Sequence, residues 1–238
     1  MSVVAVIAGA GNGTRLGSQG AKALVSLGGE PLLVHAVRSM VESGVIDECV
    51  VTAPIGHIAS FQQALERAGL NAKVVAGGST RQASVAAGLD AAGDADYVLI
   101  HDAARALTPH AQIRAVVQAL RAGHPAVVPA LPVVDTVKRV GPLAEDGTEP
   151  VLETLERGVL RGMQTPQGFF MEMIRDVHRR FAAAAENEEG SAPDDAFLAE
   201  AAGEPVVLVP GSERAMKITR SLDLKIAELL LQDPEAGL

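Results

Sequence analysis

The sequence has few of the residues on which several large classes of protein depend. Among its 238 residues there are one cysteine, no tryptophan, one tyrosine and five phenylalanines. Because Cys49 has no partner with which to form a disulfide bond, we expect a reducing compartment, the cytoplasm. The scarcity of aromatic side chains disfavours a protein that stacks the bases of single-stranded nucleic acid.

Long apolar runs and an excess of basic residues are also missing. No apolar run reaches the roughly 20 residues of a membrane span, and no basic region with a cleavable apolar segment opens the sequence. Acidic residues outnumber basic ones by 29 to 20, which gives a formal net charge of −9. Nucleic acids and anionic membranes attract broad basic surfaces, so we expect neither as a partner. If the ligands are polyanions, the few cations must be gathered at one site.

The first part of the sequence contains a pattern typical of phosphate binding. An apolar, β-branched run at 3–7 predicts a buried strand, and glycines then recur at every second position: Gly9, Gly11 and Gly13. Two cations, Arg15 and Lys22, follow. Glycine lets backbone N–H groups approach a phosphate without a Cβ in the way, and cations complete such a cradle. Without the two cations, a tight connection that binds nothing would be an equally good interpretation.

Two better-known glycine motifs do not fit this segment. A P-loop requires Lys-Ser or Lys-Thr directly after its last glycine, but Thr14 and Arg15 follow Gly13. The dinucleotide fingerprint has Thr14 in place of its third glycine, and the next predicted strand ends at 52–54 in Thr-Ala-Pro rather than in a ribose-binding carboxylate. A nicotinamide or flavin enzyme is therefore not expected.

Predicted strands and helices alternate along most of the chain. Apolar runs predict strands at 3–7, 48–53, 73–76, 97–101, 126–130 and 206–210. Apolar residues at helical spacing predict helices at 31–42, 58–68, 81–92, 109–122, 171–185 and 221–232. The alternation is typical of an α/β fold with a parallel sheet covered on both faces, and we expect a single domain over residues 1–238.

Two segments interrupt the alternation. Residues 132–160 have no helical period and contain a Gly/Pro turn, which predicts a protruding β-like arm that needs a partner to bury its apolar residues. Residues 164–170 are expected to lead the chain back from this arm. The charged segment 186–195 predicts a loop, in which Asp194 and Asp195 are expected to be solvated.

Polar residues concentrate where the predicted strands end, and the carboxyl ends of parallel strands are where ligands bind in such sheets. The candidates are Arg15, Lys22, Gly77, Gly78, Ser79, Thr80, Arg81, Ser84, Asp102, Arg105, Asp135, Thr136 and Lys138. Each has a simpler alternative. Arg81 and Ser84 could be ordinary residues of a first helical turn, and Asp102 could cap a turn rather than hold Mg²⁺ beside phosphates. His101 is interpreted as a packed or hydrogen-bonded residue, since no second histidine stands at a suitable spacing.

Taken together, the motifs resemble a known family. The segments AGAGNGTR with Lys22, GGSTRQASV, HDAAR, LPVVDTVK, ER…QTPQGF and MKITRSLDL are similar, in order, to those of 2-C-methyl-D-erythritol 4-phosphate cytidylyltransferases. The resemblance covers nearly the whole chain. It implies a Rossmann-like nucleotidyltransferase fold, a homodimer joined by β-arms, and Mg²⁺-dependent transfer of CMP from CTP in the non-mevalonate isoprenoid pathway.

The resemblance also implies roles for particular residues. It assigns catalysis to Arg15, Lys22, Arg157 and Lys217. It assigns CTP binding to Ala8, Gly9, Ala10, Gly11, Gly78, Ser84 and Ala103, and Mg²⁺ binding to Asp102. It assigns the polyol phosphate to Arg105, Thr136, Arg157 and Lys217, with Thr136 and Arg157 reaching over from the arm of the neighbouring subunit.

The sequence departs from the family pattern at Ala21, Ala106, Pro193 and Phe197. The two alanines replace prolines that the family commonly has, and no charge is lost. Two rivals stay open at this point: a cytidylyltransferase for another polyol phosphate, such as ribitol 5-phosphate, and a non-catalytic nucleotide-sensing protein with the same fold.

Overall fold

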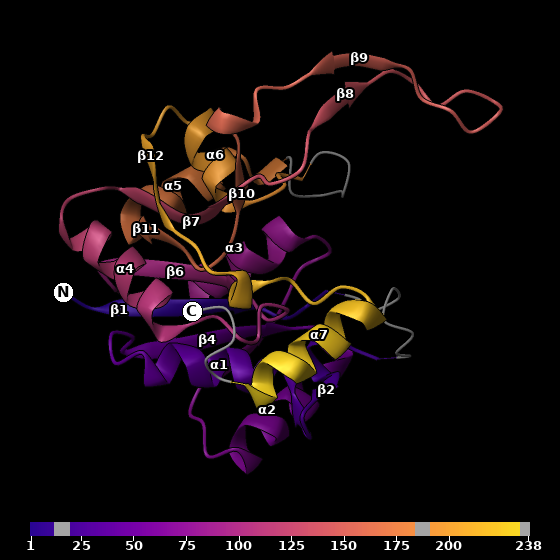
Figure 1. The fold of residues 1–238 in the computed structure, drawn as a ribbon. Coiled ribbons are helices and arrows are strands. Elements are labelled where there is room, and N and C mark those ends of the chain that lie inside the picture. The colour runs from indigo at the N-terminus through magenta and orange to yellow at the C-terminus, as the bar shows by residue number, and fades with distance from the viewer. Residues whose placement is uncertain (12–19, 184–190, 234–238) are drawn as a thin grey trace.

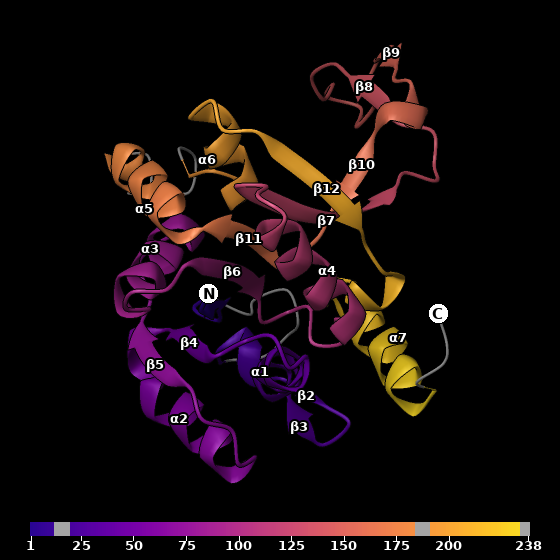
Figure 2. The same ribbon diagram turned by 90° about the vertical axis from the view of Figure 1, so that its left-hand side faces the viewer.

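The computed structural model describes residues 1–11, 20–183 and 191–233, and its centre is a mostly parallel eight-stranded sheet. The strand order is β10-β7-β11-β6-β1-β4-β5, with β12 also paired to β7 (Figures 1 and 2). The strands are β1 (Val3–Ala8), β4 (Glu48–Ala53), β5 (Lys73–Ala76), β6 (Tyr97–Asp102), β7 (Ala126–Pro132), β10 (Arg161–Met163), β11 (Gln167–Phe170) and β12 (Val206–Pro210). The predicted α/β fold class is confirmed.

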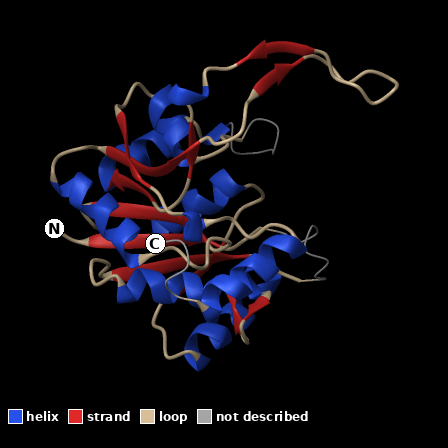
Figure 3. Cartoon of the chain, viewed as in Figure 1, coloured by secondary structure: helices blue, strands red, loops and turns tan. Residues whose placement is uncertain are grey.

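Helices cover both faces of the sheet (Figure 3). One face carries α1 (Leu32–Glu42), α2 (Ile58–Arg67) and α4 (His110–Arg121), and the other carries α3 (Arg81–Ala91), α5 (Met171–Arg180) and α6 (Asp195–Ala201). Successive side chains of β1 enter opposite cores, Ala5 and Ile7 toward α1 and Val4 and Val6 toward α3. This two-sided burial explains why the strand reads as a continuous apolar run.

Smaller elements complete the described chain. The last helix, α7 (Ser221–Gln232), packs beside a short hairpin made of β2 (Ser26–Leu27) and β3 (Glu30–Pro31). Four short 3₁₀ helices are η2 (Lys22–Leu24), η3 (Ile55–His57), η4 (Arg157–Val159) and η6 (Glu213–Ala215). No helix in the described ranges is both long enough and apolar enough to cross a membrane.

Most predicted elements are confirmed to within one or two residues, but the short strands β2, β3, β10 and β11 and the helix α6 were not predicted. Residues 167–170 form β11, which lies antiparallel between β6 and β7. The segment predicted to be a solvated loop ends in α6, where the Asp194 side chain caps the helix by accepting the Phe197 N–H. The expectation that Asp195 is solvated is wrong, because Asp195 is fully buried. The helix predicted at 171–185 ends at Arg180.

The arm, residues 132–160, leaves the sheet after β7 and returns through β10. Its strands β8 (Lys138–Val140) and β9 (Val151–Thr154) pair antiparallel with each other and stand away from the rest of the molecule (Figure 1). No residue from 132 to 162 is buried, and Val134, Val151 and Leu152 are all more than half exposed. The protruding β-arm is therefore as predicted, and in the described part of the chain several of its large apolar side chains are exposed.

Candidate active site

A pocket of about 480 Å³ lies at the carboxyl ends of β1, β5 and β6. Three chain segments that follow these strands form most of its wall, and two later residues close one side. The lining residues are Ala8, Gly9, Ala10, Gly11, Lys22, Ala23, Gly78, Ser79, Thr80, Arg81, Ser84, Asp102, Ala103, Ala104, Lys217 and Thr219. The pocket thus has the position at which ligands bind in open parallel sheets.

The loops that follow β1 and β5 contain glycine at positions where the surrounding atoms leave no room for a side chain. Gly9 donates its N–H to the Thr52 carbonyl at 3.0 Å, and a Cβ on Gly9 would lie 2.8 Å from the Phe61 ring. A Cβ on Gly77 would lie 2.4 Å from the Ala10 Cβ, so any side chain there would push the two loops apart. Glycine at both positions lets the loops meet and bring their backbone to the pocket wall.

Ser84 ties the second loop to helix α3. Its hydroxyl donates to the Thr80 carbonyl at 2.8 Å and accepts the Gly78 N–H at 3.1 Å. The Thr80 side chain in turn caps α3 by accepting the Ala83 N–H at 3.1 Å. Ser84 therefore fixes the shape of the loop, and a structural role for this residue is part of any role in binding.

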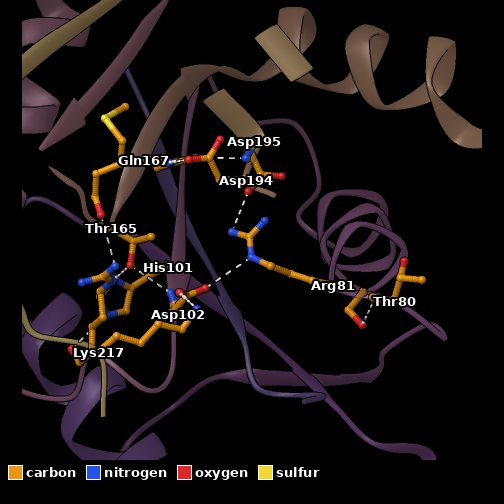
Figure 4. A network of polar contacts seen from close by, with 12 residues as sticks. Thr80, Arg81, His101, Asp102, Thr165, Gln167, Asp194, Asp195 and Lys217 are labelled. Carbon is orange, nitrogen blue, oxygen red and sulfur yellow. Dashed lines mark hydrogen bonds and ion pairs between the residues drawn. The ribbon is translucent and has the colours of Figure 1, made fainter. Parts of the chain in front are cut away.

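Asp102 is the only carboxylate among the described residues that line the pocket. It ends β6, and its two carboxylate oxygens face different cations (Figure 4): Oδ2 lies 2.8 Å from Lys217 Nζ, and Oδ1 lies 3.4 Å from Arg81 Nε. Burial alone would raise the pKa of Asp102, but the charges of Arg81 and Lys217 outweigh it and hold that pKa well below its usual range. Asp102 is therefore ionised at neutral pH.

His101 lies directly beneath the pocket and is fully buried. Thr165 Oγ1 accepts the Asp102 N–H at 3.1 Å and lies 2.9 Å from His101 Nδ1, while His101 Nε2 lies 3.3 Å from the Arg105 carbonyl. Burial lowers the pKa of His101 to about 4, so the ring is neutral. A neutral ring that accepts from Thr165 and donates to Arg105 satisfies both nitrogens, which confirms the interpretation of His101 as a hydrogen-bonded core residue.

The pocket is a basic site in an acidic protein. Among its described lining residues three are cationic, Lys22, Arg81 and Lys217, against the single carboxylate of Asp102. The formal net charge of the whole chain is −9. The expectation that the few cations gather at one site is met, and such a pocket attracts polyanions.

A sequence profile described as 2-C-methyl-D-erythritol 4-phosphate cytidylyltransferase matches residues 3–233. The chain belongs to this family. It is 47% identical to the cytidylyltransferase of that name from Streptomyces avermitilis, covering 95% of this chain and 90% of the relative. It is also 47% identical to the one from Rhodococcus jostii, covering 97% and 96%.

The fold agrees with solved members of the family. The crystal structure of the 2-C-methyl-D-erythritol 4-phosphate cytidylyltransferase from Thermus thermophilus superposes with a TM-score of 0.78 at 35% identity, covering 98% of this chain and 100% of that one. The 4-diphosphocytidyl-2C-methyl-D-erythritol synthase from Anaerococcus prevotii gives a TM-score of 0.80 at 28% identity, covering 97% and 98%. The resemblance inferred from the motifs is therefore confirmed over the whole length of the fold.

The structure brings together most of the residues that membership of the cytidylyltransferase family implies. Those that line the pocket are Ala8, Gly9, Ala10, Gly11, Lys22, Gly78, Ser84, Asp102, Ala103 and Lys217. Thr136 and Arg157 lie on the exposed arm, where Arg157 donates to the Val134 carbonyl. Arg15 lies outside the described residues.

Arg105 is not among the residues that line the pocket. Its guanidinium donates to the Ala215 carbonyl at 2.7 Å and to the Met163 carbonyl at 3.3 Å. These bonds tie the strand β10 at the base of the arm to the segment that carries Lys217. In this structure Arg105 links two segments next to the pocket rather than lining it. Its predicted contact with the polyol phosphate stays a prediction.

Two pocket residues were missed or undervalued in the sequence. Arg81 had an ordinary role in a first helical turn as its alternative, yet its side chain reaches across to Asp102. Thr219 received no role, although it lines the pocket and donates from N and Oγ1 to Asp223. The available signal for Arg81 was a cation three residues after the glycine pair, Gly77 and Gly78, that follows a predicted strand.

The donor set fits one magnesium ion that is shared with a phosphate ligand. In the described part of the chain, no group of three or more His, Cys, Asp or Glu side chains could hold a metal alone. Mg²⁺ in nucleotide sites is commonly held by one or two carboxylates, with phosphate oxygens and water completing its shell. Asp102, an ionised carboxylate at the pocket wall, is the residue that would provide that ligand.

Proposed function

We propose that the pocket binds CTP and Mg²⁺, and that this chain transfers CMP from CTP to 2-C-methyl-D-erythritol 4-phosphate. The products are 4-diphosphocytidyl-2-C-methyl-D-erythritol and pyrophosphate. The observation that carries the proposal is that one glycine-lined pocket at the carboxyl end of the sheet contains Lys22, Arg81, Lys217 and Asp102. Family membership over residues 3–233 supports the identity of the two substrates.

The chemistry needs no general base. A phosphomonoester carries close to two negative charges at neutral pH, because its second pKa is about 6. One of its oxygens attacks the α-phosphorus of CTP, the bond from that phosphorus to the bridging oxygen breaks, and pyrophosphate leaves with the electron pair. The protein has to bring two anions into line and neutralise the charge that spreads over the phosphoryl oxygens.

The cations of the pocket suit this task. Lys22 and Lys217 reach the pocket from opposite ends of the sequence, and Arg81 enters from the start of α3. Lys22, together with Arg15, would stabilise the transition state, and Lys217 would hold the incoming phosphate. Mg²⁺ on Asp102, when bound, would neutralise charge on the phosphate oxygens of CTP.

The second substrate needs groups that this pocket does not contain. Besides Arg105 and Lys217, the residues assigned to the polyol phosphate are Arg157 and Thr136, and both of these lie on the exposed arm. We infer a homodimer in which each arm lies against the other subunit and carries these two residues to its pocket. The apolar exposure of the arm supports this pairing. A cytoplasmic location, inferred from the single cysteine, is part of the same proposal.

A pyrophosphate-release assay tests the function. The protein is incubated with CTP and Mg²⁺, and with either 2-C-methyl-D-erythritol 4-phosphate, ribitol 5-phosphate or no acceptor. We expect rapid release with the first acceptor and only background in the other two reactions. Faster release with ribitol 5-phosphate would assign the chain to another polyol phosphate. No release with any acceptor, from a protein that still binds CTP, would support a nucleotide sensor instead.

A further inference from the structure

Arg81 contacts a second carboxylate that lies outside the pocket. Its Nη2 is 2.8 Å from Asp195 Oδ2, a shorter contact than the 3.4 Å from its Nε to Asp102 Oδ1 (Figure 4). Asp195 is 0% exposed and does not line the pocket, and Arg81 is the lining residue with which its side chain pairs. Arg81 therefore lies between one carboxylate in the pocket and one carboxylate behind it.

Asp195 is fixed in place by the neighbouring strand. Its backbone N–H and that of Ala196 both donate to Gln167 Oε1, at 3.1 and 3.0 Å, and Gln167 Nε2 donates to Asp194 at 3.0 Å. Gln167 is the first residue of β11, in the centre of the sheet. The start of α6 is thus held to the sheet by side-chain bonds, and the Asp195 carboxylate has a defined position.

His178 holds the other oxygen of the same carboxylate. His178 Nε2 lies 3.0 Å from Asp195 Oδ1, and both side chains are buried. The charge of Arg81, with the His178 contact, holds the pKa of Asp195 below its usual value although burial raises it. The anion behind the pocket is therefore present at neutral pH, with one oxygen toward His178 and one toward Arg81.

The arrangement holds the Arg81 guanidinium between two carboxylates. Breaking a buried ion pair is costly, so Asp195 limits how far the Arg81 guanidinium can swing. Without Asp195, the planar fork of Arg81 could pair with both oxygens of Asp102, since bidentate pairing with a carboxylate is favourable. That pairing would compete with Lys217 for Asp102 and remove a cation from the pocket wall.

We propose that Asp195, oriented by His178, is a positioning residue that holds the Arg81 guanidinium at the wall of the CTP pocket and keeps Asp102 open to Lys217 and to a phosphate-bound cation. The inference rests on the proposed function, because it gives Arg81 a part in arranging CTP. A misplacement of about 1 Å at a reacting centre can cost on the order of a hundredfold in rate. Asp195→Asn should therefore lower kcat by a factor on the order of 10–10², with the KM for the methylerythritol phosphate little changed.

A double-mutant cycle tests the coupling. Asp195→Asn, Arg81→Ala and the double variant are compared by kcat and by kcat/KM for CTP. If Asp195 acts through Arg81, Asp195→Asn has no further effect once Arg81 is alanine. Asp47→Asn is a control for the same substitution away from the pocket, because Asp47 is exposed and accepts the Val3 N–H at 2.7 Å at the opposite end of the sheet. Asp47→Asn should change kcat little, and by the same factor whether residue 81 is arginine or alanine. The inference would be overturned if Asp195→Asn lowered kcat by the same factor in the wild-type and Arg81→Ala backgrounds.

A second pair of variants covers the case in which Asp195→Asn does not fold. His178→Gln keeps an N–H that can donate to Asp195, whereas His178→Leu keeps the bulk and loses the donor. We expect His178→Gln to retain most of kcat and His178→Leu to lose several-fold, with both measured at a temperature at which circular dichroism shows the proteins to be folded. Equal kcat values for the two variants would overturn the role of His178 in orienting Asp195.

The cycle also separates this inference from the proposed function. If the wild-type protein binds CTP but releases no pyrophosphate with any acceptor, the proposed function fails. The same four proteins are then compared by calorimetric CTP dissociation constants. Non-additive effects of Asp195 and Arg81 on those constants would retain the positioning role, and additive effects would reject it.

Discussion

The pocket and the arm are built in opposite ways. The pocket side chains are fixed within one chain: Asp102 is paired to Lys217 and Arg81, and Arg81 is paired in turn to a buried carboxylate. The arm has no buried residue and few contacts beyond its own hairpin, yet it carries Thr136 and Arg157. The chain therefore arranges the proposed CTP half of its site alone, and in the proposed homodimer the polyol half would form between the two subunits.

The largest expected effect lies in the pocket. Lys22→Ala removes a pocket cation that we propose stabilises the charge developing on the phosphate, and turnover should fall by a factor on the order of 10²–10³. The fold should be unchanged, since Lys22 begins a short 3₁₀ helix at the pocket wall. Steady-state kinetics and a circular dichroism melt check the two parts. Near-wild-type kcat in a folded variant would remove Lys22 from the chemistry.

The next prediction joins the two regions. Lys22→Ala and Arg157→Ala proteins should each be nearly inactive, but they should complement each other when subunits exchange. Random exchange makes half of the dimers mixed, each with one intact site, so roughly a quarter of wild-type activity should return. Exchange is verified with differently tagged subunits. Mixed dimers without activity would mean that Arg157 does not act across the subunit boundary.

Asp102→Asn tests the metal ligand in the pocket. A neutral amide is a poor ligand for Mg²⁺, so the concentration for half-maximal activity should rise on the order of ten- to a hundredfold. The measurement is a Mg²⁺ titration at saturating CTP, with Asp47→Asn as the control carboxylate. A titration curve that overlays the wild-type curve would leave Asp102 with a purely structural role.

The smallest expected effect on folding is on the arm. Leu99→Ala in the core of β6 should lower the free energy of unfolding by about 2–5 kcal/mol. Leu152→Asn, at an exposed position of β9, should change that free energy in the dissociated protein by less than about 0.5 kcal/mol, while it weakens self-association measured by sedimentation. A large loss of monomer stability on Leu152→Asn would show that the arm packs on its own chain.

The sequence was sufficient for features that depend on local pattern. Strands buried on both faces, such as β1 and β6, appear as unbroken apolar runs, and Asp102 was found because it follows one of them. The arm was predicted because residues 132–160 show no helical period. The family resemblance depended on several motifs in a fixed order, because no single motif would have identified the family.

The features that were missed depend on contacts between distant segments. The four residues of β11 are too short to show alternation, and only the gap between β6 and β7 makes them a strand. Asp195 stands in an acidic stretch of the sequence, and the residue type alone does not distinguish a buried aspartate from a solvated one. Its burial depends on Arg81, His178 and Gln167, which come from three other elements.

The insertion of β11 also fixes the order in which this sheet can be completed during synthesis. The ribosome releases β6 first, then β7, then the whole arm, and only afterwards the strand that must lie between β6 and β7. Until residue 170 has emerged, the edge of β6 lacks its native neighbour, and an unpaired edge is a site for pairing with other chains. A nascent chain therefore passes through a stage in which all residues of the arm have been synthesised while the β6 edge still lacks β11, and an exposed edge at that stage favours pairing with other chains.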